Sequence, residues 1–235
     1  MSARPGLLQL AAEFSDLSNP ATRLGAGNIY QLYELYFEPL RDAPVVLLEL
    51  GVNRGESLKT WASYFARGTV IGVDCEDPRA DFDAHPNLRF ELADQRDGAR
   101  LADICRTHAP GGVDIIVDDA SHLGTFSLMS YNALFPHLKP GGLYCVEDWA
   151  TAYWTDWPDG APFKPFAPQP PSDRIEKQIP THDHGMAGFV KYLVDEVMSR
   201  GIRDTMTAPL TRPDRLEFLH IFKPAVVMKK AMPPS

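Results

Sequence analysis

Two stretches of this sequence carry acidic residues at spacings that can support metal chemistry, and one of them also carries a histidine. In the stretch VDIIVDDASH, an apolar run ends in Asp118 and Asp119, and His122 follows three positions after Asp119. In the stretch LYCVEDW, a second apolar run ends in Glu147 and Asp148. Four carboxylates that converge at one edge of a sheet would repel one another and raise each other's pKa unless a cation lay among them.

A hard divalent cation suits these residue types best. Mg²⁺ prefers oxygen ligands and usually keeps water or substrate oxygens in its remaining positions. We therefore predict a divalent-metal site among these four carboxylates. His122 would face the same pocket, where it could act as a general base. The competing interpretation is that these acids are solvated groups at the ends of strands.

The turn after the first apolar run, ELGVNRGES, indicates a nucleoside-like ligand. Gly51 and Gly55 would let the backbone approach a ligand without a Cβ clash. Their spacing is GxxxG and not the GxGxxG that binds a pyrophosphate, which disfavours a dinucleotide cofactor. Glu49 would repel a pyrophosphate but could hold a cationic amino-acid group. This combination favours S-adenosylmethionine.

Polar residues at the ends of the next two apolar runs extend this prediction. Asp74 ends TVIGVD, where an acid commonly accepts hydrogen bonds from ribose hydroxyls. Asp94 ends LRFELAD, and with Gln95 beside it could hold an adenine amino group. An acid at a strand end is often only a solvated loop residue. Because these residues follow consecutive predicted strands in order, we favour a shared ligand site.

The elements that would position these residues alternate between strand and helix. The apolar runs predict strands at 45–51, 69–74, 88–94, 113–119 and 143–148, and helical periodicity predicts helices at 56–67, 97–108 and 127–138. This alternation predicts a Rossmann-like, doubly wound parallel sheet. The stretches LEFLHIF and AVVMKKA, on either side of Lys223 and Pro224, predict an antiparallel hairpin at one edge.

Three segments lie outside this alternation. Residues 7–41 are predicted to be helical, which would make residues 1–44 an N-terminal helical cap. Residues 154–180 are rich in proline and aromatics without periodicity, which predicts a lid loop. A further helix is predicted at 186–200, ending at Gly201. We expect one domain of 235 residues.

Composition narrows the classes of partner. A formal net charge of -8 argues against a nucleic-acid-binding face, which would need clustered Lys and Arg. No stretch approaches the ~20 apolar residues of a membrane span, and no secretory signal pattern is visible, so we expect a soluble cytoplasmic chain. The three cysteines form no CxxC pair, so neither disulfides nor a zinc site is expected. A small-molecule or oligosaccharide substrate fits these features.

Taken together, these motifs resemble the macrocin and mycinamicin type of sugar O-methyltransferase. The resemblance is carried by NIYQLYELYFEPL, LELGVNRGESLKTW, GVD, ADQRD, VDDASH, VEDW, HDHGM and LEFLHIFKPAVVMKK, and VDDASH followed by VED is its most specific part. It implies a class I methyltransferase fold with a seven-stranded sheet, S-adenosylmethionine and Mg²⁺ as cofactors, Mg²⁺ ligands at Asp119, Glu147 and Asp148, and His122 as the base. The cofactor contacts that it implies are Glu49, Gly51, Asp74, Asp94 and Asp118, with Tyr30 covering the cofactor from the N-terminal helix.

The resemblance implies methyl transfer to a sugar hydroxyl, but alternatives stay open. Trp149, Tyr153, Trp154 and Trp157 could stack on a phenol or catechol acceptor as well as on a sugar ring. A non-catalytic S-adenosylmethionine-binding module is a second alternative, and a nicotinamide-linked dehydrogenase is disfavoured by the missing GxGxxG. We expect the chain to depart from the family in its proline-rich loop and in lacking a large auxiliary N-terminal domain. The resemblance therefore implies neither the acceptor nor whether the chain forms a homo-oligomer.

Overall fold

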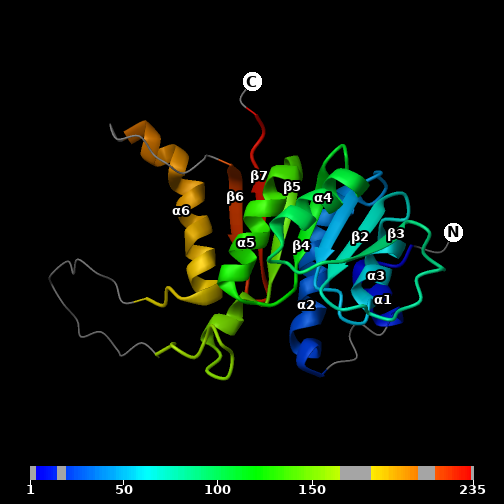
Figure 1. Ribbon diagram of the computed structural model, residues 1–235, viewed down its shortest axis with the longest axis horizontal. Coiled ribbons are helices and arrows are strands. Elements are labelled where there is room, and N and C mark those ends of the chain that lie inside the picture. The colour runs from blue at the N-terminus through cyan, green and yellow to red at the C-terminus, as the bar shows by residue number, and fades with distance from the viewer. Residues whose placement is uncertain (1–3, 15–19, 165–180, 206–214, 234–235) are drawn as a thin grey trace.

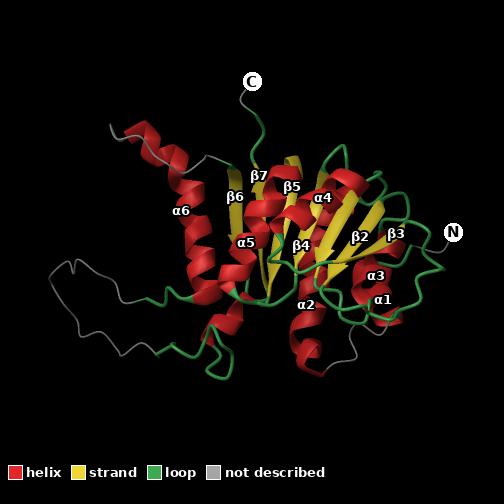
Figure 2. Cartoon of the chain, in the orientation of Figure 1, coloured by secondary structure: helices red, strands yellow, loops and turns green. Residues whose placement is uncertain are grey.

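The centre of the computed structural model is a seven-stranded sheet in the order β3-β2-β1-β4-β5-β7-β6 (Figures 1 and 2). Residues 4–14, 20–164, 181–205 and 215–233 are described. The strands are β1 (Val46–Leu50), β2 (Thr69–Asp74), β3 (Leu88–Leu92), β4 (Val113–Asp118), β5 (Leu138–Glu147), β6 (Leu216–Ile221) and β7 (Ala225–Lys230). Strands β1 to β5 are parallel, whereas β7 runs antiparallel to both β5 and β6. The predicted mostly parallel sheet with a C-terminal antiparallel hairpin is confirmed.

Helices cover both faces of the sheet. They are α1 (Leu7–Glu13), α2 (Pro20–Phe37), α3 (Glu56–Tyr64), α4 (Gly98–His108), α5 (Gly124–Leu134) and α6 (Gly185–Thr205), with short 3-10 helices η1 (Glu38–Leu40), η2 (Phe135–His137) and η3 (Trp149–Tyr153). Helices α1, α2 and α3 share one buried apolar cluster with the sheet, and α4, α5 and α6 share a second one. The fold is therefore three-layered, with one core on each side of the sheet (Figure 2).

The alternation of side chains along the strands decides which face each acidic residue occupies. In β1, Leu47 lies in the core on the α1–α3 side, and Leu48 lies in the core on the α4–α6 side. Successive side chains of a strand point to opposite faces, so Glu49 points to the α1–α3 side. By the same rule Glu147 points to the α1–α3 side and Asp118 to the α4–α6 side. Acidic residues at adjacent positions of one strand therefore reach opposite faces of the sheet.

Strand β5 is longer than the sequence pattern predicts. It begins at Leu138 and includes the Lys-Pro-Gly-Gly stretch, residues 139–142, which lies before the predicted strand 143–148. Its register against β4 is irregular between Val113 and Ile115, where five positions on β5 oppose two on β4. Gly141 has a φ of +77°, which only glycine adopts without strain. Extra residues of this kind are accommodated as a bulge, so the strand continues through a sequence typical of a turn.

Helix α6 also exceeds its predicted end. It has 21 residues and continues through Gly201 to Thr205. A glycine inside a helix costs only about 1 kcal/mol relative to alanine, so it need not end a helix. Although α6 has the length of a membrane span, no helix among the described residues combines that length with enough apolar character to cross a membrane.

Candidate active site at the carboxyl ends of the strands

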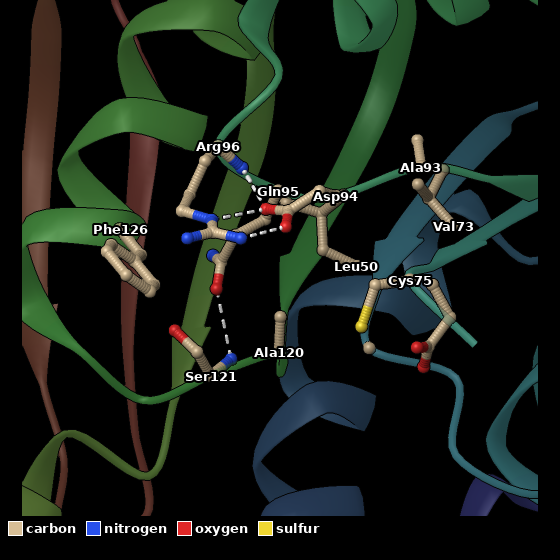
Figure 3. A pocket seen from close by; sticks show the side chains of 12 residues that line it. Leu50, Val73, Cys75, Ala93, Asp94, Gln95, Arg96, Ala120, Ser121 and Phe126 are labelled. Atoms are coloured by element: carbon tan, nitrogen blue, oxygen red, sulfur yellow. Dashed lines mark hydrogen bonds and ion pairs between the residues drawn. The ribbon is translucent and has the colours of Figure 1, made fainter.

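A cavity of about 330 Å³ opens at the carboxyl ends of β1, β2 and β3, beside the loop that follows β4 (Figure 3). Its lining residues are Leu50, Gly51, Val73, Asp74, Cys75, Ala93, Asp94, Gln95, Arg96, Ala120, Ser121 and Phe126. Small-molecule sites are typically ~300 to 1,000 Å³, and open α/β sheets bind ligands at this edge. Four of the residues that we predicted to bind the cofactor, Gly51, Asp74, Asp94 and Gln95, therefore line one cavity of suitable size.

The first turn packs its backbone directly against the loop after β4. Gly51 has a φ of +86°, and a Cβ at this position would lie only 2.1 Å from the carbonyl oxygen of Asp119. Gly55 has a φ of +81° and precedes α3 as its N-cap. Gly51 is thus required for the close approach of the two loops, whereas Gly55 shapes the start of α3 and does not line the cavity.

Asp74 fixes this turn to the end of β2. One carboxylate oxygen accepts hydrogen bonds from the backbone nitrogens of Val52, at 2.7 Å, and Asn53, at 3.1 Å, and the other accepts from that of Glu76, at 3.0 Å. Partial burial raises the pKa of Asp74, but these backbone hydrogen bonds outweigh it and hold the pKa below its usual value. An ionised carboxylate has about four acceptor sites, so Asp74 can still accept a hydrogen bond from a ligand.

An arginine next to Asp94 forms part of the cavity wall. Arg96 Nε donates to Asp94 Oδ1 at 2.9 Å, and a second guanidinium nitrogen pairs with the other oxygen. This pairing lowers the pKa of Asp94 to about 2. The guanidinium also lies over the ring of Phe126, 5.1 Å from the ring centroid (Figure 3). We did not predict Arg96 or Phe126 as site residues, because only the tertiary structure brings the two together.

Gln95 connects the cavity to a buried acid on the α4–α6 side. Its side-chain oxygen accepts from Ser121 N at 3.1 Å (Figure 3), and its nitrogen donates to Ser130 Oγ at 3.4 Å. Ser130 Oγ in turn donates to Asp118 Oδ2 at 2.8 Å. Asp118 is 2% exposed, and burial raises its pKa. Asp118 therefore supports Gln95 through Ser130 and does not itself line the cavity.

Glu49 and Tyr30 lie behind the cavity wall, on the α1–α3 side. The carboxylate of Glu49 is 1% exposed and accepts hydrogen bonds from Ser57 Oγ, at 2.9 Å, and Trp61 Nε1, at 3.0 Å. Tyr30 is also buried, and its ring lies 5.6 Å from the ring of Trp61. Neither residue is part of the cavity lining.

Beside the cavity, two aspartates and one histidine form a cluster, which we call the acidic cluster. Asp119, His122 and Asp148 each place one potential metal-ligand atom within 4.8 Å of the others. His122 Nε2 lies 3.9 Å from Asp119 Oδ1 and 3.9 Å from Asp148 Oδ2. Partial burial, followed by the charge of Glu147 and Asp148, raises the pKa of Asp119 well above its usual range. Among the described residues, no lysine or arginine pairs with Asp119 or Asp148 to offset this repulsion.

Glu147, the third predicted ligand, is held at the edge of this cluster by helix α2. Tyr33 Oη donates to Glu147 Oε1 at 2.6 Å. Tyr33 is fully buried and stacks on Phe37 with ring centroids 4.9 Å apart. The sequence predicts only a helix at this position, and no local signal distinguishes Tyr33 from a purely structural tyrosine.

Two residues of the cluster have unusual backbone conformations. His122 has a φ of +52° and Asp148 a φ of +49°, in the left-handed region that non-glycine residues seldom adopt. Such conformations cost of the order of 1–3 kcal/mol each and persist only where the surroundings hold them. The carbonyl oxygen of His122 accepts hydrogen bonds from Thr151 Oγ1, at 3.2 Å, and Trp157 Nε1, at 3.1 Å. Asp148 N donates to Pro224 O at 3.0 Å.

The predicted lid, residues 154–180, lies partly outside the described residues. In its described part, residues 154–164, the indole of Trp157 donates to the His122 carbonyl, and the ring of Phe163 lies 5.1 Å from that of Tyr153. The prediction that the whole segment closes over an acceptor stays a prediction.

The sheet order, with a cavity after β1 to β3 and an acidic cluster after β4 and β5, defines a class I Rossmann-like methyltransferase fold. A solved structure of the MycE methyltransferase from the mycinamycin biosynthetic pathway, in complex with Mg, SAH and mycinamycin VI, is similar over 98% of this chain and 56% of that chain. The TM-score is 0.72 and the sequence identity 26%.

Curated relatives give a consistent result. The 8-demethyl-8-alpha-L-rhamnosyl tetracenomycin-C 2'-O-methyltransferase of Streptomyces olivaceus is 39% identical over 157 residues, which are 64% of this chain and 39% of that protein. The mycinamicin VI 2''-O-methyltransferase of Micromonospora griseorubida is 40% identical over 129 residues, 52% of this chain and 31% of that protein. No protein-family model matches the chain. These comparisons confirm the resemblance to the macrocin and mycinamicin type of sugar O-methyltransferase. The matches cover less than half of each relative.

Proposed function

We propose that this chain transfers a methyl group from S-adenosylmethionine to a sugar hydroxyl of a glycosylated natural product, with the assistance of Mg²⁺. One observation carries the proposal. In the loop between β4 and α5, Ala120 and Ser121 line the cavity, whereas the flanking residues Asp119 and His122 belong to the acidic cluster. A methyl donor in the cavity and an acceptor at the cluster would therefore be neighbours. The two relatives named above are O-methyltransferases of glycosylated antibiotics, which supports this class of acceptor.

The cavity residues fit S-adenosylmethionine in type and order. Asp74 would accept hydrogen bonds from the ribose, and the Gly51 turn would allow the backbone to approach the ligand. Asp94 and Gln95 would lie at the adenine end. Asp118 would act indirectly, through Ser130 and Gln95. Contacts of Glu49, Tyr30 and Gly55 with the cofactor stay predictions.

The acidic cluster fits Mg²⁺ because its carboxylates are hard oxygen donors. Asp119 and Asp148 would bind the ion directly, and Glu147 would complete the set from the edge of the cluster. The raised pKa of Asp119 supports this assignment, since a nearby cation would offset both the burial of this charge and its repulsion by the neighbouring carboxylates. When bound, Mg²⁺ would supply the positive charge that makes an acceptor hydroxyl more acidic.

His122 would take the proton of the acceptor hydroxyl. Its Nε2 lies 3.9 Å from two carboxylate oxygens, too far for a direct hydrogen bond with either, so it can accept a proton from an oxygen placed between them. As that proton leaves, the acceptor oxygen bonds to the methyl carbon and the bond from carbon to sulfur breaks. The products are a methyl ether and S-adenosylhomocysteine. The protein contributes orientation and a proton acceptor at the correct place.

The test is turnover by the wild type and by His122→Ala, with His137→Ala as the matched control. His137 lies in η2, before β5, at the end of that strand opposite to Glu147. The acceptors are mycinamicin VI, p-nitrophenyl α-L-rhamnopyranoside and catechol, with S-adenosylhomocysteine formation as the readout. Loss of a general base typically lowers kcat by ~10²- to 10⁴-fold. We expect that loss for His122→Ala only, with an unchanged S-adenosylmethionine Kd by calorimetry in both variants.

Each other outcome selects a different function. Methylation of catechol alone would support the phenol alternative. Binding of S-adenosylmethionine without turnover of any acceptor would indicate a non-catalytic binding module. Wild-type kcat in His122→Ala would show that His122 is not the base.

A further inference from the structure

One carboxylate connects the beginnings of two helices next to the acidic cluster. Asp159 Oδ2 accepts hydrogen bonds from the backbone nitrogens of Gly124, at 2.7 Å, and Met186, at 2.8 Å. Gly124 is the first residue of α5, and Met186 is the second residue of α6. A Cβ on Gly124 would lie 2.1 Å from the carbonyl group of Gly185, so the two helices begin in backbone contact. Free N–H groups and the helix dipole both favour an anion at this point.

The segment that carries Asp159 also holds the backbone of His122. Trp157 Nε1 and Thr151 Oγ1 donate to the His122 carbonyl oxygen, at 3.1 Å and 3.2 Å. Asp159 binds the backbone nitrogen two positions further along. Residues 151–159 therefore hold the loop between β4 and α5 through three hydrogen bonds, two to the carbonyl oxygen of His122 and one to the backbone nitrogen of Gly124.

These hydrogen bonds are needed because His122 has a strained backbone conformation. With a φ of +52°, the backbone of His122 would relax to an ordinary conformation if the loop were free. Such a change would move the imidazole away from Asp119 and Asp148. Misplacement of a catalytic group by about 1 Å can lower the rate ~10²-fold.

A second contact attaches the start of α6 independently of Asp159. His182 is 6% exposed, and its Nε2 lies 2.6 Å from the carbonyl oxygen of Ala152. The rings of Tyr153 and Phe163 pack edge-on against it, at 5.1 Å and 5.2 Å. Replacement of Asp159 should therefore loosen the shared helix cap without detaching α6.

We propose that Asp159 is a positioning residue for His122: by capping α5 and α6 together, it fixes the loop that places the imidazole beside Asp119 and Asp148. The inference rests on the proposed function, because it assigns Asp159 a role through the proposed base. Asp159 itself does not line the cavity and does not belong to the acidic cluster. The described part of the predicted lid then serves as a clamp on the catalytic loop.

The first arm of the test compares Asp159→Ala, Asp159→Asn and the control Asp156→Ala. Asp156 is an exposed acid on the same segment and makes no hydrogen bond or ion pair with the described residues. With an acceptor that the wild type methylates, Asp159→Ala should lower kcat about 10- to 100-fold. The S-adenosylmethionine Kd should stay within about twofold, since the cavity is intact. Asp159→Asn should restore part of the rate, because its amide oxygen can still accept both hydrogen bonds. Asp156→Ala should behave as the wild type.

The second arm is a double-mutant comparison. If Asp159 acts only through His122, adding Asp159→Ala to His122→Ala should cause no further loss of kcat. A further loss as large as that seen in the wild-type background would overturn the proposal, because Asp159 would then act independently of the base.

The third arm needs no acceptor. Hydrogen exchange at the amides of residues 121–124 and of Met186 should be at least about tenfold faster in Asp159→Ala than in the wild type, as expected when a buried donor loses its partner. Unchanged exchange would reject the clamp. If the wild type methylates no acceptor, the proposed function fails. The exchange at His122 and its neighbours then decides by itself whether Asp159 positions this loop.

Discussion

Replacing Asp119 by asparagine should stabilise the metal-free protein while it removes turnover. A carboxylate oxygen of Asp119 lies within 4.8 Å of one of Asp148. At 4.8 Å, two unit charges repel by about 0.9 kcal/mol at the dielectric constant of water and by about 3.5 kcal/mol at an effective dielectric constant of ~20. The two side chains retain 37% and 55% of their exposure, so solvent screening favours the lower end of this range. We expect a gain of ~1 kcal/mol in the free energy of unfolding.

The assay is thermal unfolding in EDTA and in Mg²⁺. In EDTA, Asp119→Asn should raise the Tm by about 2–4 °C, the shift that ~1 kcal/mol produces in a chain of this size. At an Mg²⁺ concentration ~100 times its Kd, the wild type should gain about 2.7 kcal/mol. The variant should gain much less, because a neutral amide oxygen replaces a charged ligand. The order of stability should therefore reverse between the two buffers, and Mg²⁺ should restore turnover only to the wild type. Asp156→Asn, an exposed change outside the cluster, serves as the control.

Two results would contradict this reasoning. A lower Tm of Asp119→Asn in EDTA would show that the Asp119 carboxylate makes a net favourable contact in the metal-free protein, and not the net repulsion that we infer. Full wild-type turnover after exhaustive EDTA treatment would reject the metal site itself.

Three further predictions test the parts of the site separately. Cys75 is exposed and lines the cavity, while the other two cysteines are buried. Maleimide should therefore label a single thiol rapidly, and S-adenosylmethionine should slow that labelling. Equal labelling rates with and without S-adenosylmethionine would place the cofactor elsewhere. Tyr33→Phe keeps the aromatic packing but removes the hydrogen bond to Glu147, which should cost ~1.5–3 kcal/mol of unfolding free energy and raise the Mg²⁺ concentration for half-maximal activity. If neither value changes, Tyr33 does not orient Glu147. Asp74→Ala should weaken S-adenosylmethionine binding by ~1–3 kcal/mol in calorimetry, and a wild-type Kd would refute its assignment.

The sequence by itself determined the fold and the edge of the sheet where chemistry is expected. Apolar runs that end in acids predict buried parallel strands, and the carboxyl ends of such strands meet at one edge whatever the details of packing. For this reason Gly51, Asp74 and Asp94 could be expected to share a cavity. The same reasoning brought Asp119 and Asp148 together, and the structure places both sets of residues there.

Only the tertiary structure decided which acids face the cavity and what holds them. Asp118 and Asp119 are neighbours in the chain, but the Asp118 side chain accepts a hydrogen bond from the buried Ser130, whereas the Asp119 side chain belongs to the acidic cluster. Tyr33 contacts Glu147 across 114 positions of sequence, and Asp159 binds the starts of two helices. These contacts depend on how α2, α5 and α6 pack on the sheet. The local pattern of a segment records its own periodicity and burial, but not the identity of the distant polar group that satisfies its hydrogen bonds.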